Sequence, residues 1–211
     1  MIYIYLETET PTEKKFTNEA DFIKTFIEVV FSKEYNKDFV IIGFNGYKNL
    51  EKQYNKLKEH EEDDYKNLVI FDSDFPVTGG GFSTRKQYLE DLKEKFKIEF
   101  ELFLYPNNKD DGIFENLLEQ IVNQKHQEVI EYFKEYESKL KNSVDEDGNC
   151  PYETPDQKAR MYAYISAFKR SLQEKELFKN RHQWSFKNKD YWDLRANALI
   201  PLKQFLSQFF E

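Results

Sequence analysis

Acidic residues follow short apolar runs at separate places in this chain. Glu7 closes one such run near the amino terminus, and Asp72 and Asp74 close a later one. Asp111 and Glu115 stand between a further apolar run and the helical pattern that comes after it. Carboxylates that are brought together repel each other unless a cation or a proton compensates their charge. Hard oxygen ligands of this kind suit Mg²⁺ or Mn²⁺, so the residues predict a cation site.

Each of these carboxylates also has an alternative, purely structural interpretation. An Asp after a strand can form a turn or cap the next helix. Asp111 and Glu115 can serve the positive end of their helix without any ligand. Glu9 is a second acidic candidate after the first apolar run, less well placed than Glu7. We expect Glu7, Asp72 and Asp74 together to mark the site, and leave both interpretations open for Asp111 and Glu115.

The elements that must position these side chains alternate between strand and helix. Buried strands are predicted at 2–6, 39–44, 67–71 and 98–104, and helical periodicity separates each from the next. Strands joined through helices pair in parallel with right-handed crossovers. The sequence therefore predicts an α/β fold, a Rossmann-like core with a mainly parallel sheet of about four strands. Parallel strands end at one edge, where ligands bind.

Helices alone are predicted beyond this core. The best internal break is 142–151, which divides a core of residues 1–141 from a helical carboxy-terminal part of residues 151–211. We expect the second part to pack on the first as one structural unit. It is locally basic and carries interleaved aromatic residues, namely Trp184, Phe186, Tyr191 and Trp192. Such a mixture can bind single-stranded nucleic acid, but we expect these aromatics to be buried against the core.

A glycine-rich turn precedes the third predicted helix. Gly80 and Gly81 could present backbone N–H groups to a phosphate, or could form a flexible turn. Ser83 is the expected cap of the helix. Arg85 lies in its first turn, where it can hold a phosphate or pair with Asp74.

The chain resembles a known domain along much of its length. A Glu that closes the first strand and an Asp-x-Asp that closes a later one resemble the toprim domain of topoisomerases, bacterial primases and overcoming-lysogenization-defect nucleases. The segments LVIFDSD, GGGFSTRKQYLEDLKEKF and FELFLYPNNKDDGIFENLLEQI, with YWDLRANALIPLKQFL near the end, look more specifically like a small bacterial toprim-like family of unknown function. The resemblance implies that Glu7 acts as general acid or base and that Asp72 and Asp74 bind Mg²⁺.

Three functions follow as hypotheses. The first is Mg²⁺- or Mn²⁺-dependent phosphodiester chemistry of the nuclease type. The second is a non-catalytic toprim-like module that binds a partner protein or a nucleotide. The third rests on FDSD, which also looks like the first motif of haloacid-dehalogenase-type phosphatases, with Asp72 as nucleophile and Asp74 as general acid.

Composition limits the partners and the compartment. The 211 residues include 31 Lys and Arg against 39 Asp and Glu, a net charge of −8, which argues against a generic DNA-coating protein. No apolar run is long enough to span a bilayer, so no membrane partner is expected. One cysteine, Cys150, can form neither an internal disulfide nor a Cys-rich zinc site, and a reducing cytoplasm is the expected compartment.

Overall fold

The structure is a computed structural model that describes residues 1–13, 15–181 and 184–211. Four strands form one sheet in the order β2-β1-β3-β4, and every pairing is parallel. Their bounds are β1 Ile2–Leu6, β2 Phe39–Gly43, β3 Lys66–Asp72 and β4 Glu101–Tyr105. The α/β prediction, with a parallel sheet and a helical carboxy-terminal part, is thus confirmed.

The parallel strands are paired so that buried residues of neighbouring strands stand opposite each other. Ile4 of β1 stands opposite Ile41 of β2 on one side and Leu68 of β3 on the other. Nearly every residue of β3 is buried, as a strand covered on both faces requires. The fourth strand begins three residues later than predicted. Lys97 takes a left-handed conformation that ends the preceding helix, and Ile98 and Phe100 are buried in the crossing segment rather than in the ladder.

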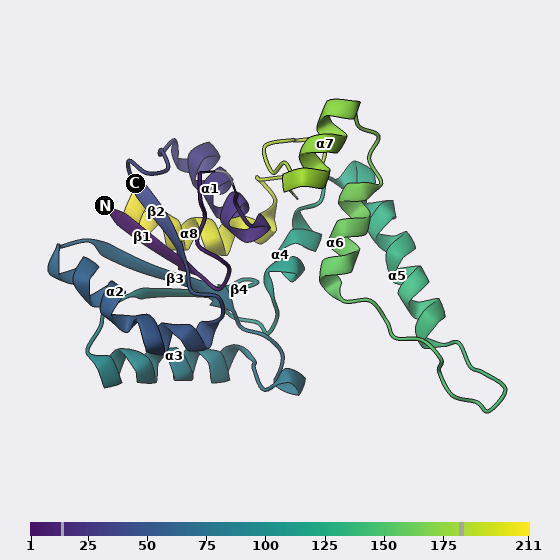
Figure 1. Cartoon of the computed structure of the whole chain (residues 1–211), viewed down its shortest axis with the longest axis horizontal. Helices are drawn as coiled ribbons and strands as arrows, with labels where there is room; N and C mark the ends of the chain where they lie inside the picture. The colour runs from purple at the N-terminus through teal and green to yellow at the C-terminus, as the bar shows by residue number, and fades with distance from the viewer. Residues whose placement is uncertain (14, 182–183) are drawn as a thin grey trace.

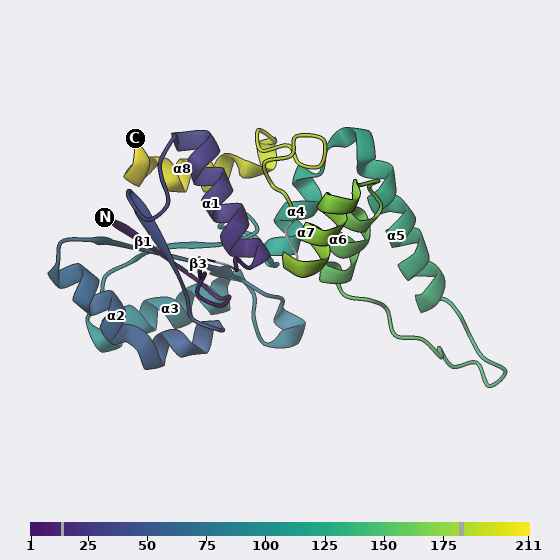
Figure 2. The ribbon, with the colours of Figure 1, turned by 45° about the horizontal axis from the view of Figure 1, so that its top comes forward.

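Helices cover both faces of the sheet (Figures 1 and 2). One face carries α1 (Asn18–Phe31), α4 (Phe114–Ile121) and α8 (Ile200–Phe210), and their apolar side chains form one core with those of the strands. The opposite face carries α2 (Leu50–Glu62) and α3 (Phe82–Phe96), which form a second core. Because the chain moves outward from β1 to β2 and then returns to place β3 on the other side of β1, its direction reverses between β1 and β3.

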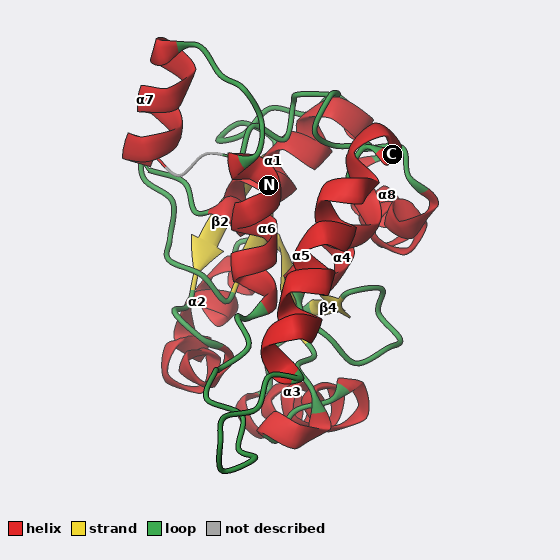
Figure 3. Ribbon diagram, turned by 90° about the vertical axis from the view of Figure 1, so that its right-hand side faces the viewer, coloured by secondary structure: helices red, strands yellow, loops and turns green. Residues whose placement is uncertain are grey.

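The remaining helices extend from one end of this sandwich. They are α5 (Gln127–Lys141), α6 (Gln157–Ser166) and α7 (Leu172–Arg181). Figure 3 shows α5 and α6 side by side, and α6 also contacts α4. The segment 142–156 between α5 and α6 carries no helix or strand. Across the described residues, no helix is both long enough and apolar enough to cross a membrane.

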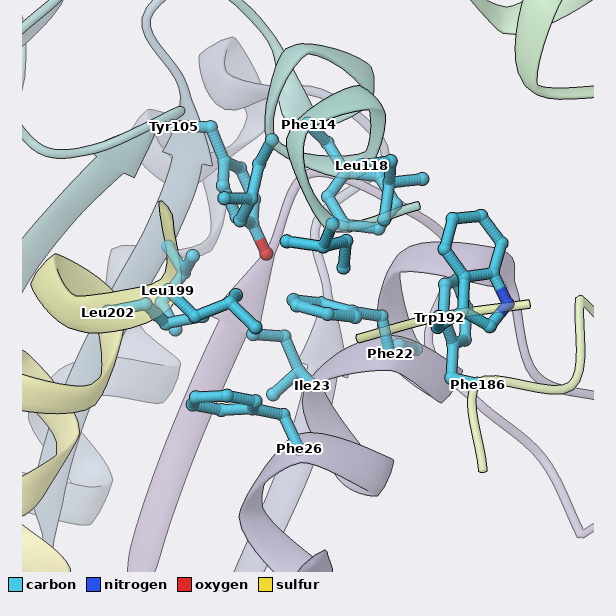
Figure 4. Packing of buried hydrophobic residues seen from close by; sticks show 14 of the residues in the cluster. Phe22, Ile23, Phe26, Tyr105, Phe114, Leu118, Phe186, Trp192, Leu199 and Leu202 are labelled. Atoms are coloured by element: carbon cyan, nitrogen blue, oxygen red, sulfur yellow. The ribbon is translucent and has the colours of Figure 1, made fainter. Parts of the chain in front are cut away.

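The interleaved aromatic residues of the carboxy-terminal part, Trp184, Phe186, Tyr191 and Trp192, are buried, as expected. Trp184, Phe186 and Trp192 are each 1% exposed, and they belong to the same core as α1 and α4. Figure 4 shows Phe186 and Trp192 next to Phe22 of α1. These rings hold the helical part against the sheet domain and are not available to stack with bases.

Candidate functional site

The site edge lies where β1 and β3 end side by side. In an open parallel sheet, ligands bind beyond the carboxyl ends of strands at the point where the strand order reverses. Here that point lies between β1 and β3, which end at Leu6 and Asp72. The helices that follow these strands begin at the same edge, so their first turns can add side chains to it.

Glu7 ties the two central strands together at this edge. Its Oε1 accepts a hydrogen bond from the backbone N–H of Asp72 at 3.1 Å. Burial of the half-buried carboxyl raises its pKa to about 7, and the nearby charge of Asp74 adds to the rise. The guanidinium of Arg85 and the backbone N–H groups of Asp72 and Tyr47 oppose it. Glu7 therefore changes protonation near neutral pH, as proton transfer requires.

Asp72 joins the end of β3 to the start of α4. Its Oδ1 accepts a hydrogen bond from the backbone N–H of Phe114 at 2.7 Å, so it serves the positive end of that helix. Burial raises the pKa of Asp72 well above its usual range, and the charges of Glu7 and Glu115 raise it further. The other oxygen, Oδ2, accepts no hydrogen bond from any described residue and is free for a ligand.

Glu19 belongs to this cluster and was missed by the sequence analysis. It lies in the first turn of α1, whose N-cap Thr17 accepts from the backbone N–H of Ala20 at 3.4 Å. Burial raises the pKa of Glu19 well above its usual range, followed by the charges of Asp72, Glu7 and Glu115. Its carboxylate has no hydrogen bond or ion pair within the described residues. The sequence could have indicated Glu19, because it lies in the first turn of α1 and this helix starts at the site edge. The long segment 8–17 between β1 and α1 made that position difficult to predict.

Glu115 and Lys158 bring the other helices into the site. Glu115 lies in the first turn of α4, and burial raises its pKa, while Lys158 opposes that rise and Asp156 adds to it. Lys158 is on α6 and also lowers the pKa of Glu19. No ion pair of Lys158 is present within the described ranges. The helical carboxy-terminal part thus supplies an uncommitted positive charge to the acidic edge.

Asp74 is paired inside the protein. It forms an ion pair and hydrogen bond with the Nη2 of Arg85, which is only 4% exposed. The guanidinium carbon lies 3.1 Å from the centre of the Tyr47 ring, in a cation–π contact. Of the two roles predicted for Arg85, pairing with Asp74 is the one that the structure contains. Its Nε is buried without a partner among the described residues.

Gly80 and Gly81 have packing roles in the turn before α3. The backbone N–H of Gly80 donates to the Phe75 carbonyl at 3.0 Å, and that of Gly81 donates to the Ser73 carbonyl at 2.8 Å. A Cβ on Gly80 would lie 2.4 Å from the Cβ of Asp74, so only glycine fits. These N–H groups are therefore committed to the turn in this structure.

Asp111, predicted as a metal ligand, lies against the start of α3. Its exposed side chain accepts a hydrogen bond from the backbone N–H of Phe82 at 2.6 Å. Gly81, and not the predicted Ser83, occupies the N-cap position of α3, so Asp111 supplies the acceptor that the cap lacks. Glu9 is also exposed and pairs with Lys15 at 2.9 Å. The structure brings together Glu7, Asp72, Asp74 and Glu115 of the predicted residues and leaves Asp111 and Glu9 outside.

The donor set fits a hard divalent cation in chemical type. The ligand atoms would be carboxylate oxygens, and burial raises the pKa values of Glu7, Glu19, Asp72 and Glu115 because it disfavours their charged forms. The fully buried hydroxyl of Tyr105 has no partner among the described residues, and burial raises its pKa, with a further rise from the charges of Glu19, Asp72 and Glu115. In the portion of the chain that the structure describes, no three His, Cys, Asp or Glu side chains already stand in a ligating arrangement. Cation binding would therefore require side-chain rotations.

Comparison with known proteins places the chain in a family but adds no function. No curated protein and no solved structure matches it. One family profile, described as a protein of unknown function (DUF3226), matches residues 17–211. The match includes Glu19, Asp72, Asp74, Glu115 and Lys158, and begins after Glu7. The chain therefore belongs to the DUF3226 family of proteins of unknown function.

Proposed function

We propose that the acidic edge is a Mg²⁺- or Mn²⁺-dependent site for phosphodiester chemistry of the nuclease type, as the toprim resemblance implies. The observation that carries the proposal is the gathering of carboxylates from β1, β3, α1 and α4 at the reversal point of the sheet. Among the described residues, Arg85 and Lys158 are cations that act on these carboxylates. A bound cation would compensate this charge and polarise a phosphoryl oxygen.

The protein's own groups have separate roles in this proposal. Asp72 holds the first turn of α4 at the edge and offers its free oxygen to the cation. Glu7, with a pKa of about 7, accepts or donates the proton of the attacking or leaving oxygen. Lys158 provides positive charge for an anionic substrate on the side of the helical part. Arg85 is occupied by Asp74 and stabilises the site rather than contacting substrate.

The test is cleavage of single-stranded DNA, nicked DNA, RNA and nucleotides with Mg²⁺ or Mn²⁺. We expect weak, Mn²⁺-enhanced cleavage that Asp72→Asn reduces at least about 100-fold, an effect typical of the loss of a central electrostatic group. Glu7→Gln should lower turnover while keeping cation binding. Glu62→Gln, which removes an exposed carboxylate remote from the edge, is the control and should match the wild type. Absence of cleavage on every substrate with either metal would reject the proposal.

A non-catalytic binding module is the second candidate, and one observation favours it. Both Glu7 and Asp72 accept backbone hydrogen bonds that join β1 to β3 and β3 to α4, so their positions have a structural use without chemistry. A polar depression of about 600 Å³, lined in part by Glu119, Gln124 and Asn197, offers a surface away from the acidic edge. The phosphatase alternative is less favoured, because the pairing of Asp74 with buried Arg85 opposes its use as a general acid.

A further inference from the structure

Positive charge gathers in one stretch of this acidic chain. Residues 157–189 carry nine Lys and Arg against two Asp and Glu, a net charge of +7. Because the whole chain carries −8, the remaining residues carry −15. Trp184 and Phe186 of this stretch are buried, so they do not cover its charged side chains. The helical part therefore presents a basic surface on a protein that is otherwise acidic.

A group of packed rings brings three parts of this surface together. The ring centre of Phe168 lies 4.1 Å from that of Tyr191 and 4.8 Å from that of His126. Phe168 follows the end of α6, Tyr191 belongs to the segment between α7 and α8, and His126 lies just before α5. The residues next to these three rings in the chain are therefore neighbours in space.

The cations beside these rings form a surface that we call the basic patch, made up of Lys125, Lys169, Arg170 and Lys189. Asn123 links two of them through the backbone. Its Oδ1 accepts a hydrogen bond from the N–H of Lys125 at 3.0 Å, and its Nδ2 donates to the carbonyl of Lys189 at 2.8 Å. The guanidinium carbon of Arg170 lies 5.6 Å from the ring centre of Tyr191. Hydrogen bonds and ring contacts thus place all four cations around one centre.

Most of the charge of the basic patch is not paired. Its three lysines are exposed, and none of them forms an ion pair with a described residue. Arg170 contacts the Phe178 ring and backbone carbonyls rather than a carboxylate. Asp190 is the acidic residue next to Lys189 in the chain, and the nearby Glu174 accepts hydrogen bonds from Ser171. The excess of positive charge favours an anion that carries several negative groups.

The helix α6 connects the basic patch with the acidic edge. Its ten residues span about 15 Å. The basic patch lies beyond its carboxyl end, whereas its first turn contains the exposed Lys158. The same helix packs on α4, whose first turn lies at the acidic edge. A chain of phosphates bound at the basic patch can therefore continue along α6 toward the edge.

We propose that the basic patch binds the phosphodiester backbone of a nucleic acid strand. Separate cations match a row of phosphates, and contacts with phosphates position a strand without reading its sequence. The rings at the centre of the basic patch are engaged with one another, so binding relies on charge rather than on stacking with bases. This surface goes beyond the proposed function, because a strand can bind there whether or not the acidic edge cleaves it.

Fluorescence anisotropy of a labelled single-stranded oligonucleotide tests the basic patch. Lys125→Gln, Lys169→Gln and Lys189→Gln together should weaken binding at low salt at least about tenfold. The loss of three phosphate contacts should also reduce the slope of log affinity against log salt by about 2. The matched control combines Lys52→Gln, Lys58→Gln and Lys66→Gln, which remove three exposed lysines from the sheet domain, and its affinity should stay within about threefold of the wild type.

Three outcomes would overturn the proposal. The first is an absence of oligonucleotide binding by the wild type at low salt. The second is an equal loss of affinity in the two triple variants, because net charge alone would then attract the strand. The third is binding of polyglutamate or of anionic lipid vesicles more tightly than the oligonucleotide, which would identify a partner of a different class.

A footprint on the wild type needs no variant that could fail to fold. Lysine acetylation, measured by mass spectrometry, should decrease at Lys125, Lys169 and Lys189 when the oligonucleotide is bound, and should not change at Lys52 and Lys58. Protection confined to other lysines would reject the basic patch. Binding with the expected pattern but without cleavage would support the patch and reject only the nuclease chemistry. Cleavage with unchanged affinity in the patch variant would keep that chemistry and reject the patch.

Discussion

Arg85 and Arg160 both pair with carboxylates, and their surroundings differ in charge balance. Arg160 of α6 pairs with Glu119 of α4 and with Glu137 of α5. Its Nε donates to Oε1 of Glu137 at 3.3 Å, and its Nη2 donates to Oε2 of Glu137 at 2.6 Å. Lys134 adds a second cation 3.6 Å from Glu119. Lys134 also pairs with Glu131 at 3.3 Å, so each of the three carboxylates in this network has a cation within ion-pair distance. At the acidic edge, Arg85 faces Asp74 while several other carboxylates have no ion-pair partner among the described residues.

The difference indicates what each network is for. The balanced group around Arg160 joins three helices, and none of its oxygens or nitrogens is buried without a partner in the described structure. The edge, in contrast, contains buried polar atoms without partners, Arg85 Nε and Tyr105 Oη. Buried polar groups are normally satisfied, so an unsatisfied and charge-rich cluster is a candidate for a ligand rather than for fold stability.

The largest expected effect comes from breaking the balanced network. Arg160→Met leaves Glu137, which is 8% exposed, without its partner. Removal of one member of a buried ion pair destabilises by about 3–5 kcal/mol. Urea unfolding should show this loss, and Arg195→Met, at an exposed arginine, should show almost none. Equal losses in the two variants would mean that the network does not join the helices.

Removal of the edge arginine should have a smaller effect that depends on conditions. Arg85→Met leaves Asp74 and Glu7 to repel each other, with a loss on the order of 1–3 kcal/mol near pH 8. Added Mn²⁺ should restore part of the stability, because it replaces the missing positive charge. Lys86→Met, at the exposed neighbouring residue, is the control. If Mn²⁺ does not stabilise the variant, the edge does not use cations in this way.

The edge should also make stability depend on pH. The pKa of Glu7 is raised from 4.5 to about 7 in the folded protein, so between these values the folded state binds more protons than the unfolded state. Stability should therefore fall as pH rises from about 4.5 to about 7, by on the order of 2 kcal/mol for this group.

Urea unfolding in EDTA at about pH 5 and about pH 8 measures this fall. Glu7→Gln removes one titrating carboxyl and should weaken the dependence, whereas Glu62→Gln should keep it. The remainder belongs to Glu19, Asp72 and Glu115, whose pKa values are also raised by burial. Parallel stability curves for Glu7→Gln and the wild type would contradict the assignment of the pH dependence to Glu7.

The smallest expected effect marks the boundary of the site. Asp111→Ala removes the acceptor at the start of α3 and should cost about 1 kcal/mol, as the loss of a helix cap does. Its Mn²⁺ affinity should equal that of the wild type. Ser83→Ala, at the residue that the sequence predicted as the cap, should be nearly neutral. A large loss of Mn²⁺ affinity in Asp111→Ala would return this residue to the set of ligands.

The architecture was predictable because each strand is a short apolar run with a helix after it. That pattern is sufficient to predict a parallel sheet and to place Asp72 at its carboxyl edge. It does not give the strand order, because the reversal between β1 and β3 depends on which helix packs on which face. The start of β4 was also misplaced, since Ile98 and Phe100 are as buried as strand residues but lie outside the ladder.

Side-chain partners at the edge were less predictable than the edge itself. Arg85 could bind a phosphate or Asp74, and sequence spacing allows both. The residue pattern does not show that the turn before α3 has a positive φ of 104° at Gly81. Asp111 was therefore predicted as a metal ligand and not as a hydrogen-bond partner of the helix that follows this turn. Glu19 was missed because its place depends on contacts between Phe22 and Phe114, two residues far apart in the chain.

The position of α8 has a consequence for biosynthesis. The ring centre of its Phe210 lies 5.7 Å from that of Phe31 and 5.8 Å from that of Phe39. The ring centre of its Phe205 lies 5.5 Å from that of Phe103. The apolar face formed by β1, β2 and α1 is complete at Gly43 but stays open on the ribosome until α8, which begins at Ile200, has emerged. During that interval the nascent chain presents aromatic surface that chaperones recognise, and its yield in cells should depend on them more than that of a domain whose early elements cover one another.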